Sequence, residues 1–186
     1  VALSEGLRQM GDYVFASCEN LERINIPNTV ESIGSGCFMY CYKMRYVTLP
    51  ENLTEIGEWA FRSNFEMETI KIPKGIKNIY SETFAGCWNL VEVDLPDGLL
   101  SIGYCAFSGC QDLREIEIPA TVTNIGERAF SYDKCLAKIE FLGDTPQIDE
   151  TAFEKTSSRA YYDPEKAGWE EAVLGSYGGE ITWVSI

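Results

Sequence analysis

The residues of this chain with the most varied chemistry are its seven cysteines, since a thiol can form a disulfide, bind a metal or act as a nucleophile. Histidine is absent, which removes the usual general base, the middle member of a Ser-His-Asp triad and the commonest ligand of zinc and copper. The sequence also has no C-x-x-C pair, no glycine-rich phosphate loop and no G-x-S-x-G turn. We therefore expect a protein that is not an enzyme, with no catalytic residue, no metal and no cofactor.

The spacing of the cysteines favours a structural role. Four of them recur at multiples of 23 residues, and two other polar residues fill the gaps. This column reads Cys18, Cys41, Asn64, Cys87, Cys110 and Asp133. We interpret it as an inward ladder of free, buried, poorly reactive thiols and small polar groups that bond to the backbone of turns. Disulfides between Cys18 and Cys41, or between Cys87 and Cys110, are an alternative, although parallel side chains disfavour the disulfide torsion.

The other three cysteines give weaker signals. Cys37 lies in a column filled mostly by alanine, so we expect it to pack in the core. Cys105 and Cys135 lie outside both columns. An odd number of cysteines raises the question of a reactive thiol, but the chain has no histidine to activate one.

Charge excludes two classes of partner. The formal net charge of −14 repels phosphate backbones and anionic lipid headgroups, so neither nucleic acid nor a membrane surface is expected to bind. No apolar run approaches the roughly 18 to 20 residues that cross a bilayer, so we expect no direct membrane insertion. The many carboxylates recur at solvated positions, and no pair is singled out for acid–base catalysis.

The elements that position these residues follow from one strict repeat. A phenylalanine occurs every 23 residues, at Phe15, Phe38, Phe61, Phe84, Phe107, Phe130 and Phe153. In the same phase each coil reads L-x-x-I-x-I-P-x-x-V-x-x-I-G-x-x-A-F-x-x-C-x-x. The I-x-I segment has the period of a half-buried strand, and the proline after it ends the strand. Because one coil cannot bury its own apolar face, successive coils must stack with parallel strands.

This pattern resembles the BspA-like leucine-rich repeats of bacterial surface proteins, which share the I-x-I-P, I-G-x-x-A-F and cysteine arrangement. The resemblance implies a repeat solenoid, a leucine-rich-repeat right-handed coil with a parallel β-sheet on one face, short helical or irregular turns on the other, and a C-terminal cap. It further implies an extracellular or cell-surface location on a bacterium and a role in adhesion to host or neighbouring proteins.

We divide the chain into a solenoid of 23-residue coils at 1–158, with the first coil truncated, and a C-terminal capping segment at 159–186. Val1 shares the phase of Ile24, so the chain is expected to open inside a strand as a fragment of a longer protein. In the cap we predict strands at 159–162 and 181–184, with a helix between them that Asp163 caps and Gly175 ends.

The cap also contains three aromatic residues, Trp169, Tyr177 and Trp183. Terminal repeats must cover an otherwise exposed core, so we interpret these side chains as cap packing. A carbohydrate-stacking site is the alternative.

The strand positions that point outward are the candidate binding surface. Apolar columns barely vary from coil to coil, whereas these positions vary freely. The candidate residues are Arg23, Tyr46, Thr48, Lys71, Glu92, Asp94, Glu115, Glu117, Lys138 and Glu140. Glu92, Asp94, Glu115 and Glu117 crowd two adjacent coils, which predicts a patch for a basic partner segment or a weakly held calcium ion. The competing interpretation is a solvated face that only keeps the protein soluble.

The sequence thus leads to an extracellular, monomeric binding or adhesion module that recognises a protein partner, such as a host extracellular protein, through its strand face. The alternative is a structural spacer that displays another domain of a longer surface protein.

Overall fold

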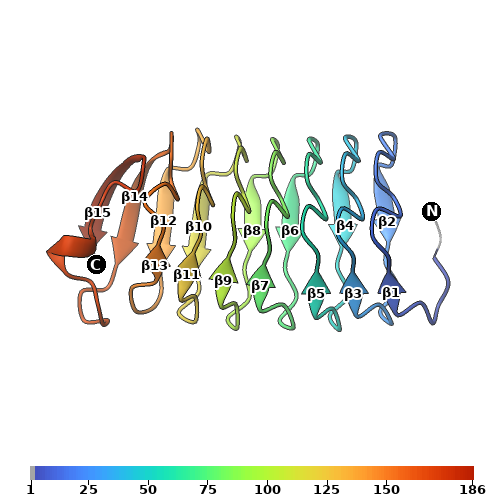
Figure 1. Cartoon of the computed structure of the whole chain (residues 1–186), viewed down its shortest axis with the longest axis horizontal. Coiled ribbons are helices and arrows are strands. Elements are labelled where there is room, and N and C mark those ends of the chain that lie inside the picture. The colour runs from blue at the N-terminus through green and yellow to red at the C-terminus, as the bar shows by residue number, and fades with distance from the viewer. Residues whose placement is uncertain (1–2) are drawn as a thin grey trace.

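The computed structural model describes residues 3–186 and shows a parallel β-solenoid whose coils stack along one axis (Figure 1). The two ends of the chain lie at opposite ends of the stack. The fold predicted from the repeat is therefore confirmed. The strand expected at Val1 lies outside the described residues.

The first series of strands is formed by the I-x-I segments and their equivalents near the C-terminus. It comprises β2 (Arg23–Asn25), β4 (Tyr46–Thr48), β6 (Thr69–Lys71), β8 (Glu92–Asp94), β10 (Glu115–Ile118), β12 (Lys138–Phe141), β14 (Ser157–Tyr162) and β15 (Glu180–Ser185). Neighbours pair in parallel, as Arg23 does with Tyr46, 23 residues on. Hydrogen-bonded pairing is interrupted twice, so the series forms three sheets, β2-β4, β6-β8 and β10-β12-β14-β15.

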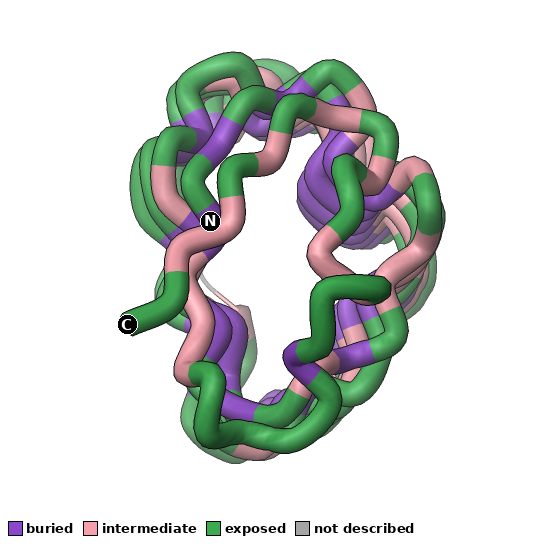
Figure 2. The backbone as a smooth tube through the Cα atoms, turned by 90° about the vertical axis from the view of Figure 1, so that its left-hand side faces the viewer, coloured by how far each residue is buried: buried purple, intermediate pink, exposed green. Residues whose placement is uncertain are grey.

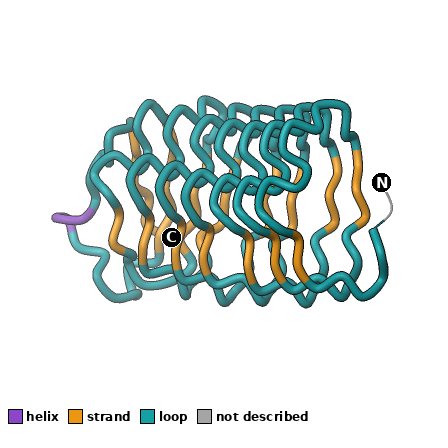
Figure 3. The backbone as a smooth tube through the Cα atoms, turned by 45° about the vertical axis from the view of Figure 1, so that its right-hand side comes forward, coloured by secondary structure: helices purple, strands orange, loops and turns teal. Residues whose placement is uncertain are grey.

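A second series of short strands forms two further parallel sheets, separated between its third and fourth strands, where the sequence predicted helical or irregular turns. It comprises β1 (Gln9–Met10), β3 (Ser32–Ile33), β5 (Glu55–Ile56), β7 (Asn78–Ile79), β9 (Ser101–Ile102), β11 (Asn124–Ile125) and β13 (Gln147–Ile148). Figure 3 shows the strands in rows along the axis, with turns between them and one helical segment near the C-terminal end.

Close approach of the coils in this second series depends on the repeated glycine. A Cβ atom on Gly34 would lie 2.7 Å from the main-chain nitrogen of Asp12, and one on Gly57 would lie 2.5 Å from that of Ser35. Both distances are shorter than real Cβ contacts, so the glycine column permits the coils to stack at this place.

The interior is a column of stacked phenylalanine rings. Consecutive rings from Phe15 to Phe153 have centroids 5.3–5.6 Å apart and are nearly parallel. The rings from Phe38 onward are fully buried, while Phe15, in the first coil, is half-buried. Figure 2, a view along the solenoid, shows that the buried residues of successive coils lie behind one another, in rows parallel to the solenoid axis. The predicted phenylalanine core is confirmed.

All seven cysteines are free thiols in the structure. Cys37, Cys41, Cys87 and Cys110 are buried, as predicted. The prediction that Cys18 is buried is wrong, because Cys18 is exposed in the first described coil, on whose outer side no coil of residues 3–186 is stacked. Of the two cysteines outside the columns, Cys105 is partly exposed and Cys135 is exposed.

Both strands predicted for the cap are present, as β14 and β15. Residue Lys138 pairs with Arg159, so this coil is two residues shorter than the repeat. The predicted helix is wrong. Asp163 accepts a hydrogen bond from the Glu165 N–H at 2.9 Å, but the turn stops at Gly168, whose φ is +84°. Only a short 3₁₀ helix, η1 (Glu171–Val173), follows.

The predicted helix does not form because Trp169, the residue after Gly168, is buried. Trp169 is only 8% exposed, and its indole N–H donates to the Gly143 carbonyl oxygen at 3.0 Å. Its ring lies 5.1 Å from Phe141 and 5.5 Å from Trp183, and Tyr177 lies 6.2 Å from Trp183. The aromatic residues of the cap therefore pack against the core, which supports the packing interpretation over a carbohydrate-stacking site.

Candidate binding surface on the strand face

The strand face is defined here as the outward side chains of the first strand series. Along these strands inward and outward residues alternate, as in β8, where only the middle residue, Val93, is buried. All ten residues predicted from the sequence lie on this face. All are exposed except Lys138 and Glu140, which are half-buried.

Ion pairs neutralise part of the charge. The Lys71 ammonium lies 3.2 Å from the Asp94 carboxylate, and the Lys138 ammonium lies 2.6 Å from that of Glu140. Lys138 also lies 5.9 Å from the centre of the Tyr161 ring. The partners in these pairs are exposed or half-buried, so each pair contributes little to stability.

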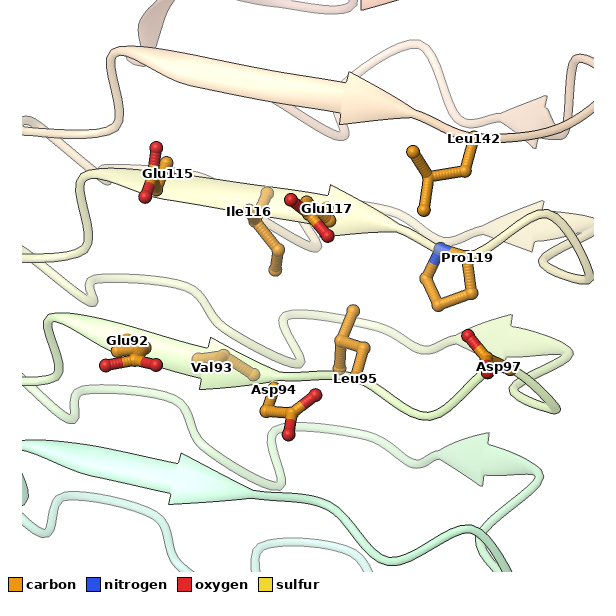
Figure 4. A pocket seen from close by; sticks show the side chains of 10 residues that line it. All are labelled: Glu92, Val93, Asp94, Leu95, Asp97, Glu115, Ile116, Glu117, Pro119 and Leu142. Atoms are coloured by element: carbon orange, nitrogen blue, oxygen red, sulfur yellow. The ribbon is translucent and has the colours of Figure 1, made fainter.

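A groove opens where the strand series is interrupted between β8 and β10. It has a volume of about 300 Å³. It is lined by Glu92, Val93, Asp94, Leu95, Asp97, Glu115, Ile116, Glu117, Pro119 and Leu142. Figure 4 shows Glu92 and Asp94 on β8 beside Glu115 and Glu117 on the neighbouring strand β10, with Asp97, Pro119 and Leu142 beyond the strand ends. We call this the acidic groove.

The acidic groove combines negative charge with apolar side chains. Within residues 3–186 no cationic side chain pairs with Glu92, Glu115 or Glu117, whereas Asp94 is paired. The negative charge of the acidic groove also affects Lys138 on the neighbouring strand β12. The pKa of Lys138 is raised, first by its hydrogen bond to Glu140 and then by the charges of Glu140, Glu115 and Glu117. The groove therefore suits a cationic group with an aliphatic stem.

Several groove residues were not predicted. Leu142, 42% exposed, stands in the column that other coils fill with proline, and this exchange was the available signal. Leu95 belongs to an inward apolar column, Pro119 belongs to the proline column that ends each strand, and Asp97 lies in a turn. Their contribution follows from the interruption between two sheets, which the repeat does not reveal.

The structure does not bring all ten predicted residues together. Arg23 and Tyr46, on β2 and β4, are at the N-terminal end of the first strand series, whereas the acidic groove lies in its middle. Thr48 and Lys71 line a smaller groove of about 180 Å³ at the other interruption, between β4 and β6. The predicted patch of Glu92, Asp94, Glu115 and Glu117 is the one that forms a single concave site.

Metal binding is not favoured by this geometry. Among residues 3–186 no group of three or more Cys, Asp or Glu side chains is arranged to hold a metal ion. We therefore do not carry the calcium alternative forward. Within the same residues no helix has the length and apolar character needed to cross a membrane.

Comparison with known families agrees with this architecture. Two overlapping segments, residues 8–135 and 60–166, match the model of the BspA type leucine rich repeat region, in six copies. The chain belongs to this family. No curated protein gives a significant match.

Solved structures with the same fold come from several bacteria. The leucine-rich-repeat protein of T. pallidum is 27% identical with a TM-score of 0.71, and the match covers 93% of this chain and 72% of that one. A leucine-rich-repeat protein from Bacteroides ovatus is 25% identical with a TM-score of 0.60, over 79% of this chain and 59% of the other. A leucine-rich cell surface protein from Faecalibacterium prausnitzii is 26% identical with a TM-score of 0.60, over 87% and 54%.

The BspA-type family and these neighbours are leucine-rich-repeat proteins, which are generally not enzymes. Family membership indicates a repeat module of the kind that commonly binds proteins, and BspA-like repeats are typically associated with bacterial surfaces. The chain spans just over half of the length of two of the three neighbours.

Proposed function

We propose that this chain is a non-catalytic binding or adhesion module that recognises a protein partner through its strand face, with the acidic groove as the main contact. The observation that carries the proposal is the groove itself. It joins apolar side chains to carboxylates that have no cationic partner within residues 3–186.

The partner segment that fits best is extended and carries lysine or arginine. The stems of these side chains can pack on Leu95 and Leu142 while their charged ends meet Glu92 and Glu115. Because the carboxylates are exposed, charge complementarity should raise the association rate and the specificity more than the affinity. We propose a host extracellular protein as the source of this segment, with the module monomeric and displayed at the surface of a bacterium.

A structural spacer is the alternative function. The continuous phenylalanine stack would hold another domain at a fixed distance and needs no binding face. The two functions differ in one measurable respect, because only the binding module loses a partner when the acidic groove is altered.

The test is a pull-down of host extracellular proteins, together with titration of extended lysine- and arginine-rich peptides. The double variant Glu92→Lys/Glu115→Lys should abolish binding and leave the fold intact. Binding to the unaltered protein should weaken as salt rises. The matched control is Glu55→Lys/Glu150→Lys, which changes the net charge equally at exposed positions outside the acidic groove. This control should retain binding.

Equal loss in both double variants would show only a general charge effect and would reject the groove as the site. Unchanged affinity in the folded Glu92→Lys/Glu115→Lys variant would reject it as well. If the unaltered protein captured no partner and no peptide, the spacer function would be favoured.

A further inference from the structure

The polar ladder is the column Cys18, Cys41, Asn64, Cys87, Cys110, Asp133 and Thr156, whose members are buried except for Cys18. Five of its members donate a hydrogen bond to the carbonyl oxygen of the phenylalanine 26 residues earlier. The pairs are Cys41 with Phe15 at 3.1 Å, Asn64 with Phe38 at 3.0 Å, Cys87 with Phe61 at 3.2 Å, Cys110 with Phe84 at 3.4 Å and Thr156 with Phe130 at 2.7 Å. The position therefore requires a donor.

Asp133 occupies this position with an acidic side chain. It is completely buried. Its Oδ1 atom accepts a hydrogen bond from the main-chain N–H of Cys110 at 2.7 Å, whereas its Oδ2 atom has no hydrogen-bond partner. By the offset that its neighbours share, the carbonyl oxygen opposite Asp133 belongs to Phe107. An ionised carboxylate would place two acceptors against each other at this fully buried place.

Within residues 3–186 no cationic side chain forms an ion pair with Asp133, and none contributes to its pKa. Cys110, from the preceding coil, is a titratable group that faces Asp133, and its own pKa is raised well above the ordinary value, mainly by burial. Thr156, from the following coil, cannot ionise, and its hydroxyl oxygen accepts the Asp133 main-chain N–H at 3.3 Å. Burial raises the pKa of Asp133 well above its usual range, against the lowering effect of the Cys110 and Gly109 main-chain N–H groups.

We infer that Asp133 is a carboxylic acid in the folded protein, that its proton is donated to the Phe107 carbonyl oxygen, and that the solenoid loses stability as this proton is lost. The acid thus takes the place that a thiol, an amide or a hydroxyl takes in the neighbouring coils. The consequence is a pH-sensitive coil inside a repeat whose buried ladder thiols, Cys41, Cys87 and Cys110, have raised pKa values and stay neutral through the physiological range.

The direction of the pH effect follows from where the proton is held. The unfolded chain releases the proton near pH 3.9, while the folded chain keeps it to higher pH. The folded state therefore binds more protons, and its stability is fully present below about pH 4 and declines as pH rises toward the folded pKa. Over this window the ratio of folded to unfolded molecules should fall by up to about tenfold per pH unit from this one group.

Infrared spectroscopy tests the protonation directly. The unaltered protein at neutral pH should show the carbonyl stretching band of a protonated carboxylic acid in a dry environment, and Asp133→Asn should lack it. Absence of the band from the unaltered protein would overturn the inference without any reliance on a variant.

Denaturant unfolding between about pH 4.5 and pH 7 tests the stability claim, below the range in which thiols of the unfolded chain ionise. Asp133→Asn supplies a permanent donor, as Asn64 does in its own coil. Its folded-to-unfolded ratio should exceed that of the unaltered protein by a factor that grows with pH. A constant factor, or a less stable variant at every pH, would contradict the inference.

The matched control is the reverse exchange, Asn64→Asp, in the same column three coils away. This variant should acquire a second carboxylic acid band and a steeper loss of stability with pH. If Asn64→Asp fails to fold at neutral pH but folds near pH 4.5, this also shows that a carboxyl group at the ladder position makes the folded state less stable as pH rises. Asn64→Asp with an unchanged pH dependence would show that the ladder position does not hold a proton.

Discussion

The phenylalanine column and the acidic groove show how differently one repeat can treat two regions. The column places the same ring in every coil, and the rings from Phe38 to Phe153 are fully buried. The groove occurs once, where five carboxylates meet apolar side chains, among them exposed Leu142, between β8 and β10. Packing density constrains the column in each coil, because a changed ring disturbs both neighbours. Solvated positions carry no such constraint, so they can differ from coil to coil.

The largest effect should come from the column. Phe84→Ala removes a ring that stacks at 5.5 Å on Phe61 and at 5.3 Å on Phe107. We expect the free energy of unfolding to fall by about 3–5 kcal/mol. Thermal or denaturant unfolding measures this, with exposed Lys77→Ala as the control that should change stability by less than about 0.5 kcal/mol. Equal losses in the two variants would refute the assignment of interior and surface columns.

Thiol reactivity sharpens the comparison between buried and exposed positions. Burial raises the pKa of Cys41 and of Cys87 to about 12, so their thiols should resist alkylation in the native protein. Exposed Cys18 and Cys135 should react first. Mass spectrometry after a short exposure to iodoacetamide, with denatured protein as the fully reactive reference, gives the order. Rapid alkylation of Cys87 in the native protein would show that its thiol is accessible to solvent and would contradict the buried ladder.

The smallest effect should come from the groove. Glu92 lies across the groove from Glu115 and has no cationic partner within residues 3–186, so Glu92→Gln should stabilise the protein by about 0.2–0.5 kcal/mol. Glu68 is the matched control because it accepts a hydrogen bond from Tyr46 and lies 3.8 Å from Arg45. Glu68→Gln should instead be neutral or slightly destabilising. Both differences should shrink in about 1 M salt, and a gain from Glu92→Gln that persists there would not be electrostatic.

Much of the fold could be predicted because each coil repeats its own local rules. The I-x-I strands, the buried phenylalanines and the terminal strands β14 and β15 are all present. The expected helix after Asp163 is not, since burial of Trp169 outweighs the local preference of its segment. The second strand series also escaped prediction, because two-residue strands leave too short an alternation to be recognised.

The candidate binding surface, like the fold, could be predicted only in part from the sequence. Alternation along each strand identified the ten outward residues, and the structure places all ten on the strand face. The acidic groove also contains Leu95, from an inward column, and Pro119 and Leu142, from the column that was expected only to end each strand. Their role depends on the interruption between β8 and β10.

By itself the sequence determined the period, the inward columns and the outward strand positions, because side-chain direction and stacking follow from local geometry repeated every 23 residues. Only the tertiary structure decided where the strand series is interrupted, that Cys18 is exposed and that Asp133 has an unpartnered oxygen. Each of these depends on what the neighbouring coil places opposite a residue. A single coil carries no information about the hydrogen-bond partners and solvent that its neighbours provide.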